Sequence, residues 1–164
     1  MKLEQLLRIR GYNTLASAVQ GAKQVGPLYH YTCYESALKI LKSDKLTTRS
    51  GWISFTRNKN LHRRDREELE LVELCTDVRL EFDGDRLSNR YRIEPYQYED
   101  VPDEDEERVS ALVISPVKHY LRGITIFADS WSAEKRDTSF EDYLKKLQQA
   151  SNTAVKVRDC EEAT

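Results

Sequence analysis

Apolar residues recur every three or four positions in four segments of the chain, a spacing that places them on one side of a helix. The four segments are residues 3–10, 14–22, 34–45 and 139–150. Thr32 stands just before the third segment, where a threonine side chain can cap a helix. Gly26-Pro27 separates the first two segments from the rest of the chain, so residues 1–25 are predicted to form a helical extension.

Strands are predicted where apolar and polar residues alternate, or where β-branched and aromatic residues cluster. Val78, Leu80 and Phe82 alternate with charged residues, as in a half-buried strand, and the sequence Asp83-Gly84-Asp85 then predicts a turn. Further strands are predicted over residues 28–31, 52–55, 91–93, 109–114, 123–127 and, at a sheet edge, 154–157. Strands outnumber helices and their order is mixed, which indicates a single α+β domain over residues 1–164.

The composition indicates a folded protein without a membrane span. Hydrophobic residues make up 39% of the chain and charged residues 33%, but nine tyrosines, four phenylalanines and two tryptophans provide large groups for a core. No apolar run approaches the length of a membrane span, and the first residues do not resemble a secretory signal. We therefore expect a cytoplasmic protein.

The cysteines and the distribution of charge exclude few classes of function. Cys33, Cys75 and Cys160 are odd in number and lack C-x-x-C spacing, so reduced thiols are expected. The formal net charge is −2, but residues 57–66 are rich in Arg and Lys and residues 99–107 are rich in Asp and Glu. Because binding to nucleic acid depends on how charge is distributed, the net charge decides nothing about partners.

Three fragments place polar residues next to predicted strands. The first is Leu28-Tyr29-His30-Tyr31-Thr32, the second is Ser54-Phe55-Thr56-Arg57-Asn58, and the third is Glu106-Glu107-Arg108-Val109. Short loops at strand ends can present such side chains on a rigid frame. Taken singly, His30 is an ordinary strand-end histidine and Arg57 belongs to a solvated basic loop; the functional interpretation depends on the three fragments together.

Several common site types have no signature in the chain. His62 and His119 have no second histidine or cysteine at metal-ligand spacing, so no metal site is expected. The phosphate-binding motif of P-loop enzymes, the glycine motif of dinucleotide-binding folds and the nucleophile motif of α/β-hydrolases are all absent from the sequence. These absences disfavour NTPases, Rossmann dehydrogenases and hydrolases of that class.

On these fragments the chain resembles the ADP-ribosyltransferase superfamily, and within it the DarT-type enzymes that modify DNA and small phage-encoded proteins of the same pattern. Those proteins carry an apolar-x-His-x-Thr motif before a helix that ends in the phrase IL-x-x-G-L. Leu28 to Thr32 resembles the motif and Ile40 to Leu46 resembles the phrase, with Asp44-Lys45 where the family has a glycine before the leucine. The resemblance covers about residues 28–127.

The resemblance implies an ADP-ribosyltransferase-like fold, a strongly bent or split mixed sheet with flanking helices. Residues 128–164 would then add a C-terminal helix and an edge strand. It also implies NAD+ as the substrate and transfer of ADP-ribose to a macromolecular acceptor, which is DNA, RNA or protein, in phage–host conflict. A phage-encoded protein of this kind would act in the cytoplasm of the host cell. The oligomeric state stays open.

Site roles follow from the same resemblance. Cleavage of the nicotinamide–ribose bond develops positive charge on the ribose, which a carboxylate can stabilise. Glu107 is assigned this catalytic role, and Arg57 would pair with the pyrophosphate or orient the acceptor. The residues expected to bind NAD+ are His30, at a ribose hydroxyl, with Tyr31, Thr32, Ser54 and Phe55.

Glu106 competes with Glu107 for the catalytic role. Side chains alternate across a strand, so Glu107 shares a face with Val109 and is predicted to point inward, whereas Glu106 is predicted to face solvent. This alternation is the reason for choosing Glu107.

Two other functions fit the sequence. One is a non-catalytic interaction protein on the same scaffold, which would use its acidic residues 99–107 to bind or mimic a nucleic-acid partner. The other is a nucleic-acid-binding module that uses the basic residues 57–66. In an enzyme His30, Arg57 and Glu107 must converge on one cleft, whereas in a binding protein they need not.

Overall fold

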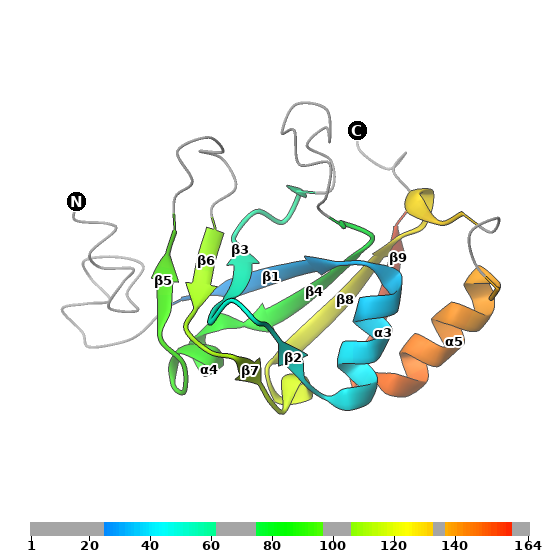
Figure 1. Cartoon of the computed structure of the whole chain (residues 1–164). Coiled ribbons are helices and arrows are strands. Elements are labelled where there is room, and N and C mark those ends of the chain that lie inside the picture. Colours follow the sequence, from blue (N-terminus) through cyan, green and yellow to red (C-terminus); the bar gives the residue numbers. More distant parts are fainter. Residues whose placement is uncertain (1–24, 62–74, 97–105, 133–136, 159–164) are drawn as a thin grey trace.

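The computed structural model describes residues 25–61, 75–96, 106–132 and 137–158 (Figure 1). They form one α+β domain with a mixed sheet, as predicted; the sheet is mostly antiparallel, and the described residues include three α-helices. The helices predicted over 3–10 and 14–22, half of the basic run and most of the acidic run lie outside the described residues. Among the described residues, no helix has the length and apolar character needed to cross a membrane.

Seven strands form the main sheet, in the order β5-β6-β3-β1-β4-β8-β9. Their bounds are β1 Pro27–Thr32, β3 Ile53–Thr56, β4 Val78–Asp83, β5 Ile93–Pro95, β6 Glu106–Val109, β8 Leu121–Phe127 and β9 Val155–Arg158. Among the described strands only β8 and β9 pair in parallel, and β9 is an edge strand as predicted. A small second sheet pairs β2 (Leu46–Thr47) with β7 (Val113–Ile114).

The main sheet bends between β1 and β3. These two strands pair at one position, Tyr29 with Thr56, whereas β1 and β4 pair along six residues. Figure 1 shows the consequence: β3, β5 and β6 stand steeply against β1, β4 and β8. The end of β3 therefore meets β1 at an angle.

Helices α3 (Tyr34–Ser43) and α5 (Phe140–Ala150) pack against each other beside the half of the sheet that contains β4 and β8 (Figure 1). The Tyr143 hydroxyl donates to Tyr34 O over 2.8 Å, and the Tyr34 hydroxyl donates to Phe127 O at the end of β8. Short 3-10 turns, η2 (Val117–His119) and η3 (Ala128–Ser130), precede and follow β8. The stripe predicted over residues 139–150 is confirmed, with Ser139 as the N-cap of α5.

The predicted cap of α3 was wrong. Thr32 is the last residue of β1, and Cys33 occupies the N-cap without a side-chain hydrogen bond. The helix also ends at Ser43, before the predicted Lys45, because Asp44 adopts the left-handed conformation with φ 54°.

The predicted turn Asp83-Gly84-Asp85 is the start of a short helix, α4 (Gly84–Ser88). Asp83 is its N-cap, and its carboxylate accepts the N–H of Arg86. Burial alone would raise the pKa of Asp83, but this N–H and the guanidinium of Arg122, 2.6 Å from the carboxylate, outweigh burial and lower the pKa. Aspartate therefore serves here as a charged helix cap.

Strand β4 is buried on both faces, not on one as the alternation predicted. Arg79, on the face opposite Leu80, is only 3% exposed. It is covered by a second apolar cluster that contains Tyr29, Tyr31, Leu61 and Phe127. Arg79 lies over the rings of Tyr29 and Phe127 and donates to Lys59 O and Thr125 Oγ1. The alternation predicted an exposed face because an arginine that packs against aromatic rings cannot be distinguished in the sequence from one that faces solvent.

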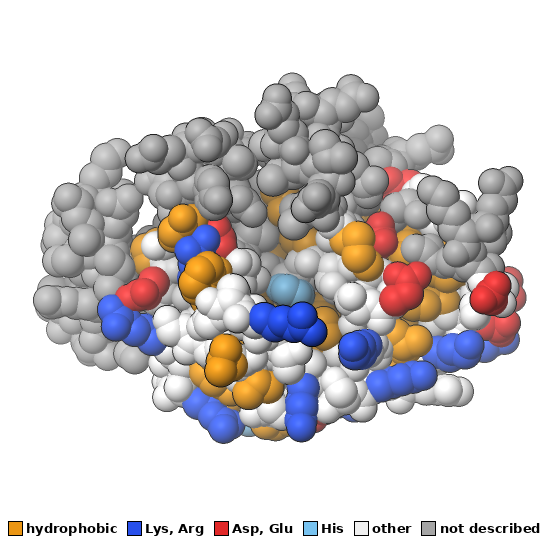
Figure 2. Space-filling model, viewed as in Figure 1, with side chains coloured by type: hydrophobic (Ala, Val, Ile, Leu, Met, Phe, Trp, Pro, Cys, Tyr) orange, Lys and Arg blue, Asp and Glu red, His pale blue; other side chains and the backbone are white. Residues whose placement is uncertain are grey.

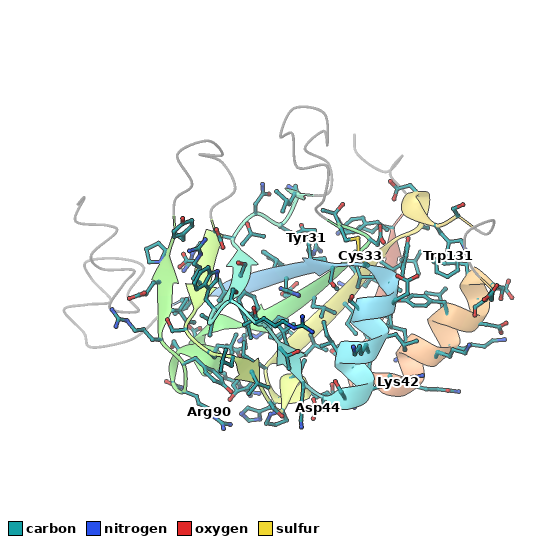
Figure 3. All side chains as sticks on the ribbon, in the orientation of Figure 1. Tyr31, Cys33, Lys42, Asp44, Arg90 and Trp131 are labelled. Carbon is teal, nitrogen blue, oxygen red and sulfur yellow. A yellow bond between two sulfur atoms is a disulfide. The ribbon has the colours of Figure 1, made fainter. Side chains whose placement is uncertain are left out.

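The expectation of reduced thiols was also wrong, because Cys33 and Cys75 form a disulfide (Figure 3). Cys33 follows β1 and Cys75 precedes β4, and these strands are antiparallel with Thr32 opposite Val78. The two cysteines therefore emerge at the same end of the strand pair, although they lie 42 positions apart in the sequence. Spacing rules that look for nearby cysteines cannot find such a pair.

Candidate functional site

A cavity of about 530 Å³ opens where β1, α3, β2 and β3 meet, at the bend of the sheet. In Figure 2 basic side chains and a histidine gather over the middle of this face, around α3 and β2. Hydroxyl groups dominate its polar lining, namely Thr32, Ser36, Ser43, Thr47, Thr48, Ser50 and Ser54. The volume lies in the range of small-molecule sites, roughly 300–1,000 Å³.

The charged groups of the cavity wall are basic. Lys39 and Lys45 line it, and no Asp or Glu does so among the residues that the structure describes. Trp52, which is 40% exposed, also lines the cavity and offers an aromatic surface at its rim. Hydroxyl groups, two ammonium groups and an indole ring together suit an anionic ligand that carries hydroxyls and a flat ring.

His30 is fixed in orientation inside this cavity. Its Nδ1 lies 2.9 Å from Ser54 O, and its ring packs against Phe55 with centroids 5.7 Å apart. Because a carbonyl oxygen can only accept, Nδ1 carries the proton and Nε2 of the neutral ring is an acceptor. Burial lowers the pKa of His30 below its ordinary value of 6.5, against the opposing effect of the Ser54 hydrogen bond, and so favours this neutral form.

Three of the predicted site residues come together in the cavity, and four do not line it. His30, Thr32 and Ser54 reach it from β1 and β3, which are joined at one register position. Phe55 supports the His30 ring from the core side. Tyr31 faces the second apolar cluster, where its hydroxyl donates to Lys59 O over 2.7 Å. Arg57 and Glu107 contact each other instead of lining the cavity.

Glu107 points inward, as predicted, and is only 1% exposed. Its Oε1 accepts the Nε–H of Arg57 over 2.7 Å, and Arg57 Nη1 donates to Val25 O. Glu107 lies opposite Phe55 in the β3–β6 ladder, on the core side of these strands. The pair therefore ties β6, the end of β3 and the segment before β1 together.

Glu106 does not face solvent, so that prediction was wrong. It is 8% exposed, and its Oε1 accepts the hydroxyl of Ser54 over 2.6 Å and the Nε–H of Arg108 over 3.1 Å. Ser54 on the neighbouring strand β3 and Arg108 on β6 itself lie on the same face as Glu106 and cover it. Ser54 lines the cavity, so Glu106 is linked to the cavity wall by its hydrogen bond with the Ser54 hydroxyl.

Arg108 is held between two aromatic rings. Its guanidinium carbon lies 4.5 Å from the centroid of the Trp52 ring and 3.1 Å from that of Tyr96. Stacking between these rings fixes the guanidinium beside Glu106. Trp52, Arg108 and Glu106 therefore form a connected wall from the cavity rim to β6.

Sequence reasoning missed Lys39, Lys45, Trp52 and Arg108. One signal was available, since Ser36, Lys39 and Ser43 lie three or four residues apart on α3 and so form a polar stripe. From the sequence alone this stripe predicts a solvent-exposed face, because the sequence does not give the angle between α3 and β3.

One group of possible metal ligands occurs among the described residues, Cys33, Cys75 and Asp77, whose ligand atoms lie within 4.8 Å of one another. The two sulfurs are joined in the disulfide, so they are not thiolate ligands in this state.

Comparison of the chain with protein-family models, and with curated proteins, finds no match.

Proposed function

We propose that the protein is an NAD+-dependent ADP-ribosyltransferase that transfers ADP-ribose to a nucleic-acid or protein acceptor, with a role in phage–host conflict. One observation carries the proposal. His30 and Thr32 of β1 and Ser54 of β3 line the same cavity, although more than 20 residues separate the two fragments. These are residues that the resemblance assigns to NAD+ binding.

The chemistry of the cavity supports a dinucleotide ligand. Lys39 and Lys45 supply positive charge for a pyrophosphate, and Trp52 supplies a surface for a base or a nicotinamide ring. The Nε2 atom of His30 can accept a hydrogen bond from a ribose hydroxyl, because Nδ1 is already used as a donor to Ser54 O. In the proposal these groups hold NAD+ while its nicotinamide–ribose bond is cleaved.

The carboxylate that stabilises the ribose charge comes from β6 in this proposal, and access to the cavity favours Glu106. Glu106 accepts a hydrogen bond from Ser54, a residue of the cavity wall, whereas Glu107 forms an ion pair with Arg57 on the core side. A carboxylate must approach the ribose to stabilise its developing charge. Glu106 would do so after exchanging the Ser54 hydroxyl for a ribose hydroxyl, and Arg108 would keep it in place.

A second candidate is a non-catalytic interaction protein on the same scaffold. The pairing of both β6 glutamates with arginines favours it, because each carboxylate already has a structural partner. In this case the acidic residues 99–107 would bind a basic partner or mimic nucleic acid, and the cavity would have no catalytic role.

Incubation of the purified protein with labelled NAD+ and a cell lysate tests the proposal. Lys39→Gln and Lys42→Gln form a matched pair, because both lysines are exposed on α3 but only Lys39 lines the cavity. We expect wild-type and Lys42→Gln protein to label lysate macromolecules and Lys39→Gln to label them more weakly. Nuclease and protease treatment of the product identifies the acceptor class. No labelling by folded wild-type protein would support the interaction protein instead.

A further inference from the structure

A second cavity, of about 310 Å³, lies on the other side of α3. Tyr34, Glu35 and Leu38 contribute to it from α3, whereas Ser36, Lys39, Ile40 and Ser43 of the same helix line the first cavity. No described residue lines both. Trp131, which Figure 3 shows near α5, and Tyr143 of α5 complete its aromatic wall.

The aromatic wall is built from three rings on three segments. The Trp131 ring centroid lies 4.9 Å from that of Tyr34 and 5.3 Å from that of Tyr143. The Tyr34 and Tyr143 rings are nearly perpendicular, with an angle of 81° between their planes. Their hydroxyls donate to Phe127 O and Tyr34 O, so both tyrosines are held in place at their polar ends. Tyr34 and Tyr143 are only 0% and 5% exposed, so they support the wall from behind, and the partly exposed Trp131 ring is the aromatic surface that faces the cavity.

The charged residues around this wall are mainly acidic. Glu35 and Asp137 line the cavity with one opposing cation, Lys146, so the described lining carries a formal charge of −1. Aromatic faces attract cations through the ring quadrupole, and tryptophan does so most strongly. The first cavity has the opposite charge character, since its described charged residues are lysines.

We propose that this second cavity binds an alkylated ammonium group, such as a trimethylammonium. A fully alkylated ammonium is a cation without N–H donors, so it gains from the face of the Trp131 ring and from the nearby carboxylates of Glu35 and Asp137, and it needs no hydrogen-bond acceptor. The same group occurs in choline-type small molecules and in trimethylated lysine of a protein. The proposal concerns this group and is independent of NAD+ chemistry in the first cavity.

The charge requirement can be isolated with two probes of the same shape. Choline carries a trimethylammonium, and 3,3-dimethyl-1-butanol replaces it with a neutral tert-butyl group. In Trp52→Phe protein, the tryptophan fluorescence comes from Trp131 alone, because the chain has two tryptophans. We expect choline to change this fluorescence saturably and the neutral probe to bind about 5-fold more weakly or worse, the size of a modest cation–π term. Equal effects of both probes, or no saturable change, would overturn the proposal.

Two exposed carboxylates provide the matched variants. Asp137 lines the cavity, and Asp142 on α5 does not. Asp137→Asn should weaken choline binding by about 3-fold or more, and Asp142→Asn should leave it unchanged. Equal binding by the two variants would contradict the assigned role of Asp137 and with it the proposed site. A trimethyl-lysine peptide and its unmodified twin then distinguish a protein ligand from a free one: tighter binding of the peptide than of choline identifies the former, and tighter binding of choline the latter.

Discussion

Asp44 ends α3 in the left-handed conformation, and its carboxylate accepts the backbone N–H of Lys118 over 2.8 Å. Its carbonyl oxygen also accepts the N–H of Val117 over 3.1 Å. Helices commonly end with glycine in this conformation, and aspartate is one of the few other residues that adopt it. The side chain of Asp44 therefore adds a link to η2 that a glycine at this position cannot make.

Asp44→Ala should lower the free energy of unfolding by about 1–3 kcal/mol, because it leaves the Lys118 N–H without this acceptor and puts a Cβ without compensation at positive φ. Asp44→Gly should be less harmful, since glycine relieves the backbone strain. Urea denaturation measures both, with Lys42→Ala as the exposed control on the same helix. Equal stability of the alanine and glycine variants would contradict the importance of the backbone conformation.

Gly84→Ala should destabilise the fold, because its Cβ would lie 2.2 Å from Gly26 O and 2.7 Å from Val25 Cγ1. The first contact is with backbone, so no side-chain rotation can relieve it. We expect a loss of about 1–3 kcal/mol, as for other overpacked positions. Gly123→Ala is the control, since its Cβ would meet Glu81 at an ordinary 3.8 Å. Thermal unfolding compares the two variants. Similar midpoints would show that Val25 and Gly26 can shift to accommodate the new Cβ without a loss of stability.

The positions of most elements were predictable because the signal is local. The stripe of α5 and the β-rich runs of β1, β3 and β8 reflect side chains that face one core, and that periodicity is written in neighbouring residues. The double burial of β4 and the Cys33–Cys75 disulfide depend on segments far away in sequence. The periodicity of apolar residues within a strand does not show whether a distant segment covers its other face.

The candidate site was predictable only in part for the same reason. His30, Thr32 and Ser54 could be named because each lies in a recognisable strand fragment. The surroundings of Glu106 could not, because they depend on the register that sets Ser54 opposite Arg108 in the ladder. Alternation assigned Glu106 to solvent, and the hydroxyl and guanidinium that bury it come from that register.

His30 should make the protein less stable in mild acid. Its folded-state pKa is below 6.5, so the unfolded chain takes up a proton first as the pH falls, and the stabilising contribution of the neutral ring is present above pH 6.5 and lost below it. We expect the stability advantage of wild type over His30→Gln to shrink between pH 7.5 and pH 5.5. Guanidinium denaturation at both values measures it. An equal change in the His119→Gln variant, which alters an exposed histidine, would contradict the role assigned to His30.

Substitution of the two β6 glutamates, one at a time, should distinguish a catalytic role from a structural one. Glu107→Gln removes the charge that pairs with the Arg57 guanidinium in a buried position, so stability should fall by about 3 kcal/mol while transfer by the folded protein persists. Thermal unfolding and transfer assays at low temperature distinguish these effects.

Glu106→Gln keeps the shape of the side chain but removes the negative charge beside the cavity wall. If that carboxylate stabilises the ribose charge, turnover should fall by about 100-fold or more while NAD+ affinity changes little, since the interaction strengthens only in the transition state. Single-turnover transfer of labelled ADP-ribose measures the first quantity and equilibrium binding measures the second. Wild-type turnover in Glu106→Gln, together with loss of turnover in folded Glu107→Gln, would return the catalytic role to Glu107.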